Sequence, residues 1–307
     1  MTWKIGRIRK SVVDAILGVD LRGHLFGLQE SLYRNELKQI QRDEEMEIIF
    51  RRLAAQLEVI RMQRDDIRSL KRALEEIRRT GAYAEAFEEK EPLITVRIAS
   101  YQKTDELIEV AVSSVLAQSY GRFELIIVND GPNDRTRKAV ASLGDSRIQY
   151  VEFPHRSNYP DDPHSRWMVA GSPGMNRGTS LATGTWIAPL DEDDLFTPDH
   201  LEKLLLLAQS KRVELAYGAL IQKNMITGDE LRIWSSPPRV SNFSFQGAIY
   251  LRQLVPTFHY DESSWVVEEP GDWNLIRRMT AAGVTMAAIE DVVATMNHTP
   301  YTHRVQL

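Results

Sequence analysis

The chain contains no cysteine, which excludes a disulfide framework, a thiolate nucleophile, a cysteine-ligated zinc site and an iron–sulfur cluster. A metal ion would have to bind to oxygen or histidine ligands. No stretch approaches 18 consecutive apolar residues, so we expect no membrane-spanning helix. Basic residues are not in excess either, since 38 Lys and Arg stand against 43 Asp and Glu. A net charge of −5 is atypical of nucleic-acid-binding proteins, and we expect no nucleic-acid partner.

The first 20 residues lack both the continuous apolar stretch and the cleavage site of a secretory signal peptide. We therefore expect a cytoplasmic protein. Apolar and basic residues mix in this stretch, which suits an amphipathic helix on a membrane surface. The simpler alternative is that these residues form a frayed terminus or a helix that packs against the protein itself. On the first interpretation, residues 1–20 contact the inner face of the membrane peripherally.

Proline is absent before Pro92, although the chain has 13 prolines, and this break predicts a domain boundary near residue 90. Residues 1–90 are predicted to be helical, because apolar residues recur at helical spacing, some of them seven apart: Met46, Leu53, Ile60, Ile67 and Leu74. The pattern loses phase near residues 33–46, so two helices or a hairpin are alternatives to one coiled coil. We expect this region to form a homo-oligomer.

Residues 91–307 form the second predicted domain, in which strands and helices alternate. This order predicts an α/β fold with a mostly parallel sheet and flanking helices. The predicted strands are 93–100, 124–129, 148–153 and 185–190. The predicted helices are 106–117, 134–143, 175–183 and 198–209, and 154–174 is predicted to be a loop. In such sheets, ligands bind beyond the carboxyl ends of the strands.

Four carboxylates follow the last of these strands, in the sequence LDEDD at 190–194. Their mutual repulsion is unfavourable unless a cation or hydrogen-bond donors neutralise it. Oxygen ligands favour Mg²⁺ or Mn²⁺, which take few protein ligands and complete their shell with substrate phosphates. One acid would suffice for the alternative role of a helix cap. The sequence therefore predicts a divalent-metal site here.

Asp130, in NDG at the end of the strand 124–129, is a second candidate acid. It can accept hydrogen bonds from a nucleobase or a ribose hydroxyl, or form an ordinary Asx turn. Neither GxGxxG after the first strand nor GxxxxGK[ST] occurs, which argues against a dinucleotide oxidoreductase and a P-loop protein.

Four segments taken together resemble family 2 glycosyltransferases with a GT-A (Rossmann-like) fold. They are PLITVRIASYQK (92–103), SSVLAQSYGRFELIIVNDGPND (113–134), LATGTWIAPLDEDDLFTPDHLEKL (181–204) and GDWNLIRRM (271–279). Their order and spacing are those of the family, and the resemblance covers most of residues 92–210.

The resemblance implies a nucleotide site at the end of the first strand, on Ala99, Ser100 and Tyr101. It further implies that Asp130 recognises uracil and that the nearby Glu192 lies beside the ribose.

The same resemblance implies that Asp191 and Asp193 belong to the DxD element, with Asp193 ligating the metal that bridges the donor diphosphate. His298 is a candidate contact to the metal or a phosphate by likeness to a family histidine; an incidental surface histidine is the alternative.

Some positions depart from the family pattern. Met175 precedes Asn176 where an arginine is frequent, which leaves open how the diphosphate charge is offset. Asn176 stays a candidate contact, and Arg166 or Arg177 are candidates to supply the missing charge.

The catalytic base of inverting members is an acid before an aromatic residue and a helix. Asp272, which precedes Trp273, is the best match, and Glu268 and Glu269 are its rivals.

The sequence thus predicts an inverting, metal-dependent glycosyltransferase. The donor would be a nucleoside-diphosphate sugar, with a UDP-sugar favoured, and the acceptor a hydroxyl of a glycan, a lipid-linked sugar or a protein. A catalytically silent scaffold of the same fold and a nucleotidyltransferase are the alternatives. The intact acids argue against the first, and the lack of a glycine-rich activation loop argues against the second.

Overall fold

The computed structural model describes residues 28–35, 38–39, 41–42, 46, 49–50, 53 and 67–298. The chain divides into two compact units, Met1–Ile60 and Arg61–Leu307. Every described residue of the first unit is helical, as predicted. The large apolar side chains among these described residues are exposed, namely Leu28, Leu32, Tyr33, Met46, Ile49, Phe50 and Leu53. The interpretation of residues 1–20 as a surface helix lies outside the described residues.

Nine strands of the described part of the second unit form one sheet, in the order β3-β2-β1-β4-β8-β6-β9-β5, with β7 paired to β6. The predicted α/β fold with a mostly parallel sheet and flanking helices is confirmed: β3, β2, β1 and β4 pair in parallel, as do β6 and β9. The strands are β1 (Ile94–Ser100), β2 (Phe123–Asn129), β3 (Ile148–Glu152), β4 (Trp186–Asp191), β5 (Leu195–Phe196), β6 (Leu215–Asn224), β7 (Glu230–Ile233), β8 (Ala248–Leu251) and β9 (Met286–His298).

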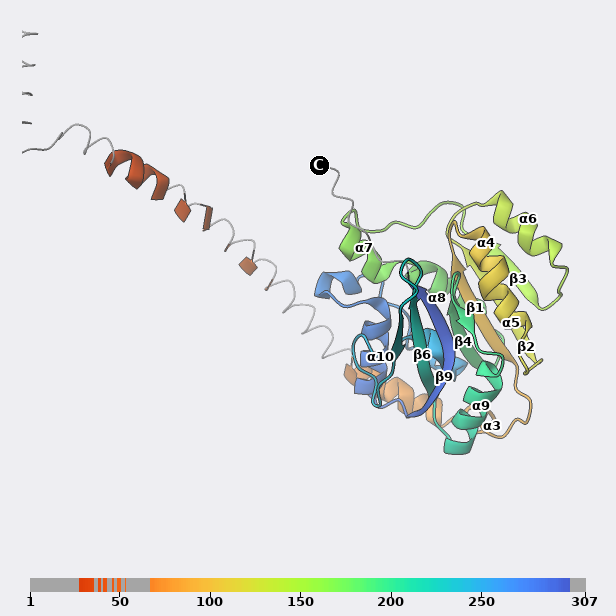
Figure 1. The fold of residues 1–307 in the computed structure, drawn as a ribbon. Helices are drawn as coiled ribbons and strands as arrows, with labels where there is room; N and C mark the ends of the chain where they lie inside the picture. The colour runs from red at the N-terminus through yellow and green to blue at the C-terminus, as the bar shows by residue number, and fades with distance from the viewer. Residues whose placement is uncertain are drawn as a thin grey trace, which may run out of the picture. The chain divides into compact units, whose positions relative to one another are not determined.

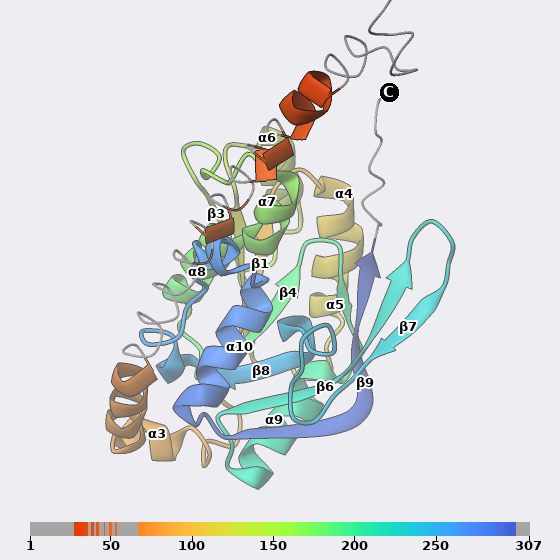
Figure 2. The ribbon, with the colours of Figure 1, turned by 90° about the vertical axis from the view of Figure 1, so that its left-hand side faces the viewer.

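Helices cover both faces of this sheet: Figures 1 and 2 show α8 and α10 on one face and α4, α5 and α9 on the other. The α-helices are α3 (Gly81–Glu85), α4 (Thr104–Glu106), α5 (Ser113–Leu116), α6 (Asp134–Ser142), α7 (Pro163–Val169), α8 (Ser172–Leu181), α9 (His200–Lys211) and α10 (Gly271–Ala282). Shorter turns are the π-helix η1 (Leu107–Val112) and the 3-10 helices η2 (Phe245–Gly247), η3 (Arg252–Leu254) and η4 (Ser264–Val267). No helix in the described part of the chain has the length and apolar character that crossing a membrane requires.

The sheet brings three strand ends together because β2, β1 and β4 are neighbours. All three are apolar and almost fully buried, as expected of parallel strands covered on both faces. The pairing register places Ser100 beside Asn129 and Ala99 beside Asp191. Helix α8 lies directly on this part of the sheet, because a Cβ at Gly174 would come within 3.3 Å of Ala99 Cβ. The sequences that follow β1, β2 and β4 therefore meet at one edge.

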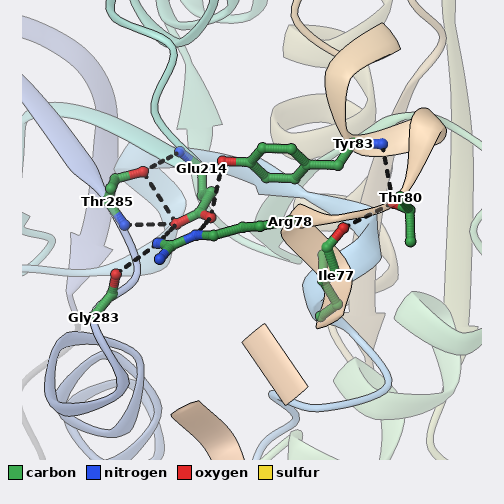
Figure 3. A network of polar contacts seen from close by, with 7 residues as sticks. All are labelled: Ile77, Arg78, Thr80, Tyr83, Glu214, Gly283 and Thr285. Carbon is green, nitrogen blue, oxygen red and sulfur yellow. Dashed lines mark hydrogen bonds and ion pairs between the residues drawn. The ribbon is translucent and has the colours of Figure 1, made fainter. Parts of the chain in front are cut away.

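The helical segment 67–78 and α3 pack on the second unit, so this unit begins well before the compositional break near residue 90. Leu70, Leu74 and Phe87 belong to its core, and the Phe87 ring lies 5.8 Å from that of Trp186 in β4. Figure 3 shows the polar contacts of the same segment around the fully buried Glu214.

The Glu214 carboxylate accepts from Arg78 Nε (2.6 Å) and Nη2 (2.8 Å), from Tyr83 Oη (3.1 Å) and from the backbone N of Thr285 (2.6 Å). Arg78 Nη2 also donates to the carbonyl oxygen of Gly283 (2.7 Å), just beyond α10. One buried carboxylate thus joins the segment before the sheet to β6 and to the turn between α10 and β9.

Candidate active site

A cleft of about 410 Å³ lies at the edge where β1, β2 and β4 end. Most of the residues predicted to bind the donor line it, namely Ala99, Ser100, Tyr101, Asp130, Arg166, Asp191, Glu192 and Asp193. The remaining lining includes residues that were not singled out from the sequence as donor contacts, among them Lys103 and Tyr159. The ends of β1, β2 and β4 thus contribute to one cleft because these strands are neighbours in the sheet.

Glu192 is fixed by the end of β1. Its Oε2 accepts from Ser100 Oγ (2.8 Å) and from the backbone N of Tyr101 (2.9 Å). Burial raises the pKa of Glu192, and these two hydrogen bonds oppose the shift. The contacts explain how the ends of β1 and β4 form one continuous wall of the cleft.

The two flanking acids, Asp191 and Asp193, each contact a donor from another segment. Lys103 Nζ lies 2.5 Å from Asp193 Oδ2, and Gln246 Nε2 donates to Asp191 Oδ2. Burial raises the pKa of Asp191; the Arg97 charge opposes this, and the charges of Asp272 and Asp193 add to it. An additional positive charge at this place would favour the ionised acids.

A divalent cation fits the chemistry of this pair of acids, since Mg²⁺ and Mn²⁺ are held by one or two carboxylates together with substrate phosphates. Within the described residues, however, no group of three or more acidic or histidine side chains converges. His298 ends β9 and is exposed. Asp191, Asp193 and His298 stay candidate ligands; the neighbour of His298, Asn297, donates to the backbone oxygen of Asp193 (2.6 Å).

Asp130, just beyond β2, is buried and accepts three hydrogen bonds from the loop that follows β3. Its Oδ1 accepts from Ser157 N (2.8 Å) and Oγ (2.7 Å), and its Oδ2 accepts from Tyr159 Oη (2.7 Å). Burial and the carboxylate together raise the pKa of Tyr159. A carboxylate can accept about four hydrogen bonds, so Oδ2, with one donor, keeps an acceptor position for a further donor such as a nucleobase N–H.

The Arg156 guanidinium lies between two rings of the cleft wall. Its Cζ is 4.3 Å from the ring centroid of Tyr101 and 5.5 Å from that of Tyr159, both within the range of cation–π contacts. The side chain thus links the end of β1 to the loop on Asp130, and presents a positive charge at the cleft.

Arg166 and Asn176 differ in their placement. Arg166 lines the cleft from α7, with its guanidinium donating to the carbonyl oxygens of Pro160 (3.1 Å) and Asp161 (2.7 Å). The Asn176 side chain instead bonds to both backbone groups of Tyr260, at 3.0 and 2.9 Å, and is not part of the cleft lining. In this arrangement Asn176 connects α8 to the segment before α10.

Asp272, in the first turn of α10, is held by three donors. Its Oδ2 accepts from Ser244 Oγ (2.6 Å) and Phe245 N (3.1 Å), and its Oδ1 accepts from Tyr260 Oη (3.0 Å). The Ser244 hydroxyl also contacts the side-chain oxygen of Gln246, whose amide reaches Asp191. The hydroxyl has one proton for these two acceptors, so Ser244 and Gln246 lie in contact between Asp272 and Asp191 without forming a continuous hydrogen-bond chain.

The rival acids have different surroundings. The Glu269 carboxylate forms an ion pair with Arg277 (2.7 Å) and accepts from the Asn274 amide (2.7 Å). Glu268 follows η4 with a positive φ of 58°, at the turn that leads into α10. Among these three acids, and within the described part of the chain, only Asp272 lies against the Ser244–Gln246 pair that reaches Asp191.

Known proteins resemble this chain in sequence and in fold. Residues 95–227 match the family model described as "Glycosyltransferase like family 2". Escherichia coli WfgD, named UDP-Glc:alpha-D-GlcNAc-diphosphoundecaprenol beta-1,3-glucosyltransferase, is 29% identical over 138 residues, which is 44% of this chain and 49% of WfgD. The succinoglycan biosynthesis protein ExoO of Rhizobium meliloti is 29% identical over 147 residues, which is 48% of this chain and 38% of ExoO. The chain spans about half or less of these relatives.

Among solved structures, S. aureus TarS 1–349 in complex with UDP-GlcNAc superposes with a TM-score of 0.52. The match covers 68% of this chain and 60% of the TarS chain at 14% sequence identity. At this identity the likeness concerns the fold: the sheet and its flanking helices have the arrangement of a GT-A domain.

Proposed function

We propose that this chain, whose residues 95–227 match the model of the family 2-like glycosyltransferases, transfers a sugar from a nucleoside-diphosphate donor to an acceptor hydroxyl with inversion. The observation that carries the proposal is the convergence of three strand ends on one cleft, with Asp191 and Asp193 in its wall and with Ser244 and Gln246 in contact between Asp272 and Asp191.

The donor would lie along the ends of β1 and β2. The Tyr101 ring and the Arg156 charge suit a nucleobase and a phosphate respectively, and Asp130 would accept a hydrogen bond from the base at Oδ2. UDP is the favoured nucleotide, because WfgD is named for UDP-Glc and the TarS complex holds UDP-GlcNAc. WfgD also suggests the acceptor class, a sugar linked to a lipid diphosphate.

Asp191 and Asp193 would hold Mg²⁺ or Mn²⁺, whose charge stabilises the departing diphosphate when the ion is bound. Asp272 would take the proton from the acceptor hydroxyl. At the same time, the acceptor oxygen attacks the anomeric carbon of the donor sugar and the bond between this carbon and the nucleoside diphosphate breaks. Tyr260, Ser244 and the backbone N of Phe245 hold the carboxylate so that its orientation is set before the acceptor binds.

A screen of UDP-, GDP- and dTDP-sugars tests this proposal. The full chain is incubated with each donor, a lipid-linked GlcNAc diphosphate acceptor and Mn²⁺ or Mg²⁺, and nucleoside diphosphate release is followed together with acceptor glycosylation. We expect release with a UDP-sugar and loss of release in excess chelator. Release of pyrophosphate would indicate a nucleotidyltransferase instead, and no turnover with any donor would favour the scaffold.

A further inference from the structure

A buried arginine interrupts the apolar strand β1. Arg97 is only 1% exposed and lies between two fully buried aliphatic residues of the strand. Its Nη2 donates to Tyr260 Oη (3.1 Å), whereas Nε and Nη1 have no hydrogen-bond partner among the described residues. A buried cation without a hydrogen-bonded carboxylate is strongly unfavourable, so its charge requires compensation from groups nearby.

The compensating groups lie at the active site. Burial lowers the pKa of Arg97, but the surrounding Tyr260, Tyr250, Asp191 and Asp272 raise it, and the net shift is upward. Side chains alternate between the faces of β1, so Arg97 lies on the same face as Ala99, the face that α8 covers. The guanidinium therefore sits behind the cleft, with acids from β4 and α10 as its nearest sources of negative charge.

One side chain connects this buried charge to the proposed base. Tyr260 Oη accepts from Arg97 and donates to Asp272 Oδ1 (3.0 Å), and its ring centroid lies 5.4 Å from Arg97 Cζ. The Tyr260 hydroxyl thus donates a hydrogen bond to the Asp272 carboxylate and accepts one from the Arg97 guanidinium. Because both Tyr260 and Arg97 are enclosed by the core, their geometry is fixed by packing.

We propose that Arg97 and Tyr260 are positioning residues for Asp272: the guanidinium stabilises the carboxylate through the intervening phenol, and the phenol fixes the orientation of the oxygen that would receive the proton. The proposal rests on the proposed function, in which Asp272 is the base. It explains why a strand of the core retains a cation that makes no ion pair of its own.

Four variants of the full chain test the pair. Tyr260→Phe removes the connecting hydroxyl and keeps the ring. Tyr250→Phe is its matched control, because Tyr250 is equally buried near Arg97 but, within the described residues, makes no hydrogen bond to Asp272. Arg97→Lys keeps the charge, and Arg97→Met removes it at similar volume. For each variant we measure kcat, the donor KM, nucleotide affinity by calorimetry and the melting temperature.

We expect Tyr260→Phe to lower kcat roughly 10- to 100-fold, the scale of losing one hydrogen bond to a charged group, with donor KM and nucleotide affinity within about twofold of wild type. Tyr250→Phe should stay near wild type, and Arg97→Lys should retain more activity than Arg97→Met when both are folded. Equal kcat in wild type and Tyr260→Phe would overturn the positioning inference but leave the proposed function standing. The same conclusion would follow if kcat fell equally in Tyr260→Phe and Tyr250→Phe. No transfer by wild type would overturn the proposed function and this inference with it.

Discussion

At the scale of single residues, each acid of the proposed site is held by donors from a different segment. Asp193 pairs with Lys103 before α4, Asp130 with the loop after β3, and Asp272 with Ser244 and Tyr260. Because these contacts are separate, substitutions at the three acids should have separable effects on metal binding, nucleotide binding and chemistry. This separation makes the role of each acid testable.

Replacing Asp193 should abolish metal-dependent nucleotide binding. Asp193→Ala removes one of the two carboxylates proposed to hold the cation and frees the Lys103 ammonium, while the partly exposed position leaves the core unchanged. Calorimetric titration of UDP with and without Mn²⁺ measures the effect, and Asp105→Ala, an exposed acid at the start of α4, is the control. Full activity of the wild type in excess chelator would contradict the metal requirement.

Replacing Asp272 should separate chemistry from binding. Asp272→Asn should keep metal and donor binding near wild type and lower transfer by roughly 10²–10⁴-fold, the usual effect of losing a general base. Glu269→Gln is the comparison, since Glu269 is paired with Arg277 and should matter less to the rate. Retained transfer in Asp272→Asn together with loss in Glu269→Gln would move the assignment to Glu269.

His200 should make folding stability depend on pH. It is fully buried against Phe196, and burial lowers its pKa to about 3, below the usual value of 6.5. The unfolded chain therefore binds the proton more readily, so stability is fully present above pH 6.5 and is lost as the pH falls toward 3. The loss should reach about 2 kcal/mol by pH 5.

Urea unfolding of wild type and His200→Gln at pH 7 and pH 5 measures this contribution. The comparison is the difference between the two proteins, because other groups such as Asp194 also titrate. We expect the wild type to lose more stability than the variant on acidification. An identical loss in both proteins would contradict the assignment to His200.

At the scale of elements, the sequence predicted β1, β2, β3 and β4 and the helices between them, apart from small differences at their ends. These strands are continuous apolar runs followed by turn residues, a pattern that local sequence carries. The sequence predicted a loop for 154–174, where the structure has α7 and the start of α8. Helix α7 is short, and its start is marked only by the Asp162 cap and Pro163.

The contacts around Asp272 were beyond sequence reasoning. Gln246, Ser244 and Tyr260 lie in irregular segments, and their positions depend on how β8 and α10 return to the sheet. Lys103 was missed for a related reason, since its partner Asp193 lies 90 positions away. Long-range pairing of this kind leaves no periodic signal in the sequence.

The contact between Arg78 and Glu214 should stabilise the second unit. Arg78→Ala leaves the fully buried Glu214 carboxylate with Tyr83 and Thr285 alone (Figure 3) and should lower the free energy of unfolding by roughly 3 kcal/mol, the lower end for breaking a buried ion pair. Arg79→Ala, at the exposed neighbouring position, should change it by less than about 0.5 kcal/mol. Equal midpoints of the two variants in urea would contradict the role of this ion pair.

At the scale of the whole molecule, the first unit is predicted to mediate self-association. Its exposed apolar residues follow the heptad-like spacing of Met46 and Leu53, which favours helix–helix contacts between copies. Removing residues 1–60 should therefore give a smaller particle by light scattering that still binds nucleotide. The same subunit number before and after truncation would contradict this prediction.

Truncation at residue 90 should behave differently from truncation at residue 60. It removes Leu74 and Phe87 from the core and Arg78 from Glu214, so the remaining protein should be less stable although it keeps every residue of the cleft. Thermal unfolding of the two truncated proteins tests this, and equal melting temperatures would show that segment 61–90 is dispensable.

The configuration of the product tests the central proposal most directly, that one displacement at this cleft transfers the sugar with Asp272 as base. The enzyme is given an α-linked UDP-sugar and an acceptor, and the anomeric configuration of the purified product is determined by NMR. The account predicts a β-linked product whose formation falls at least roughly 100-fold in Asp272→Asn. An α-linked product, or an undiminished yield from the variant, would contradict it.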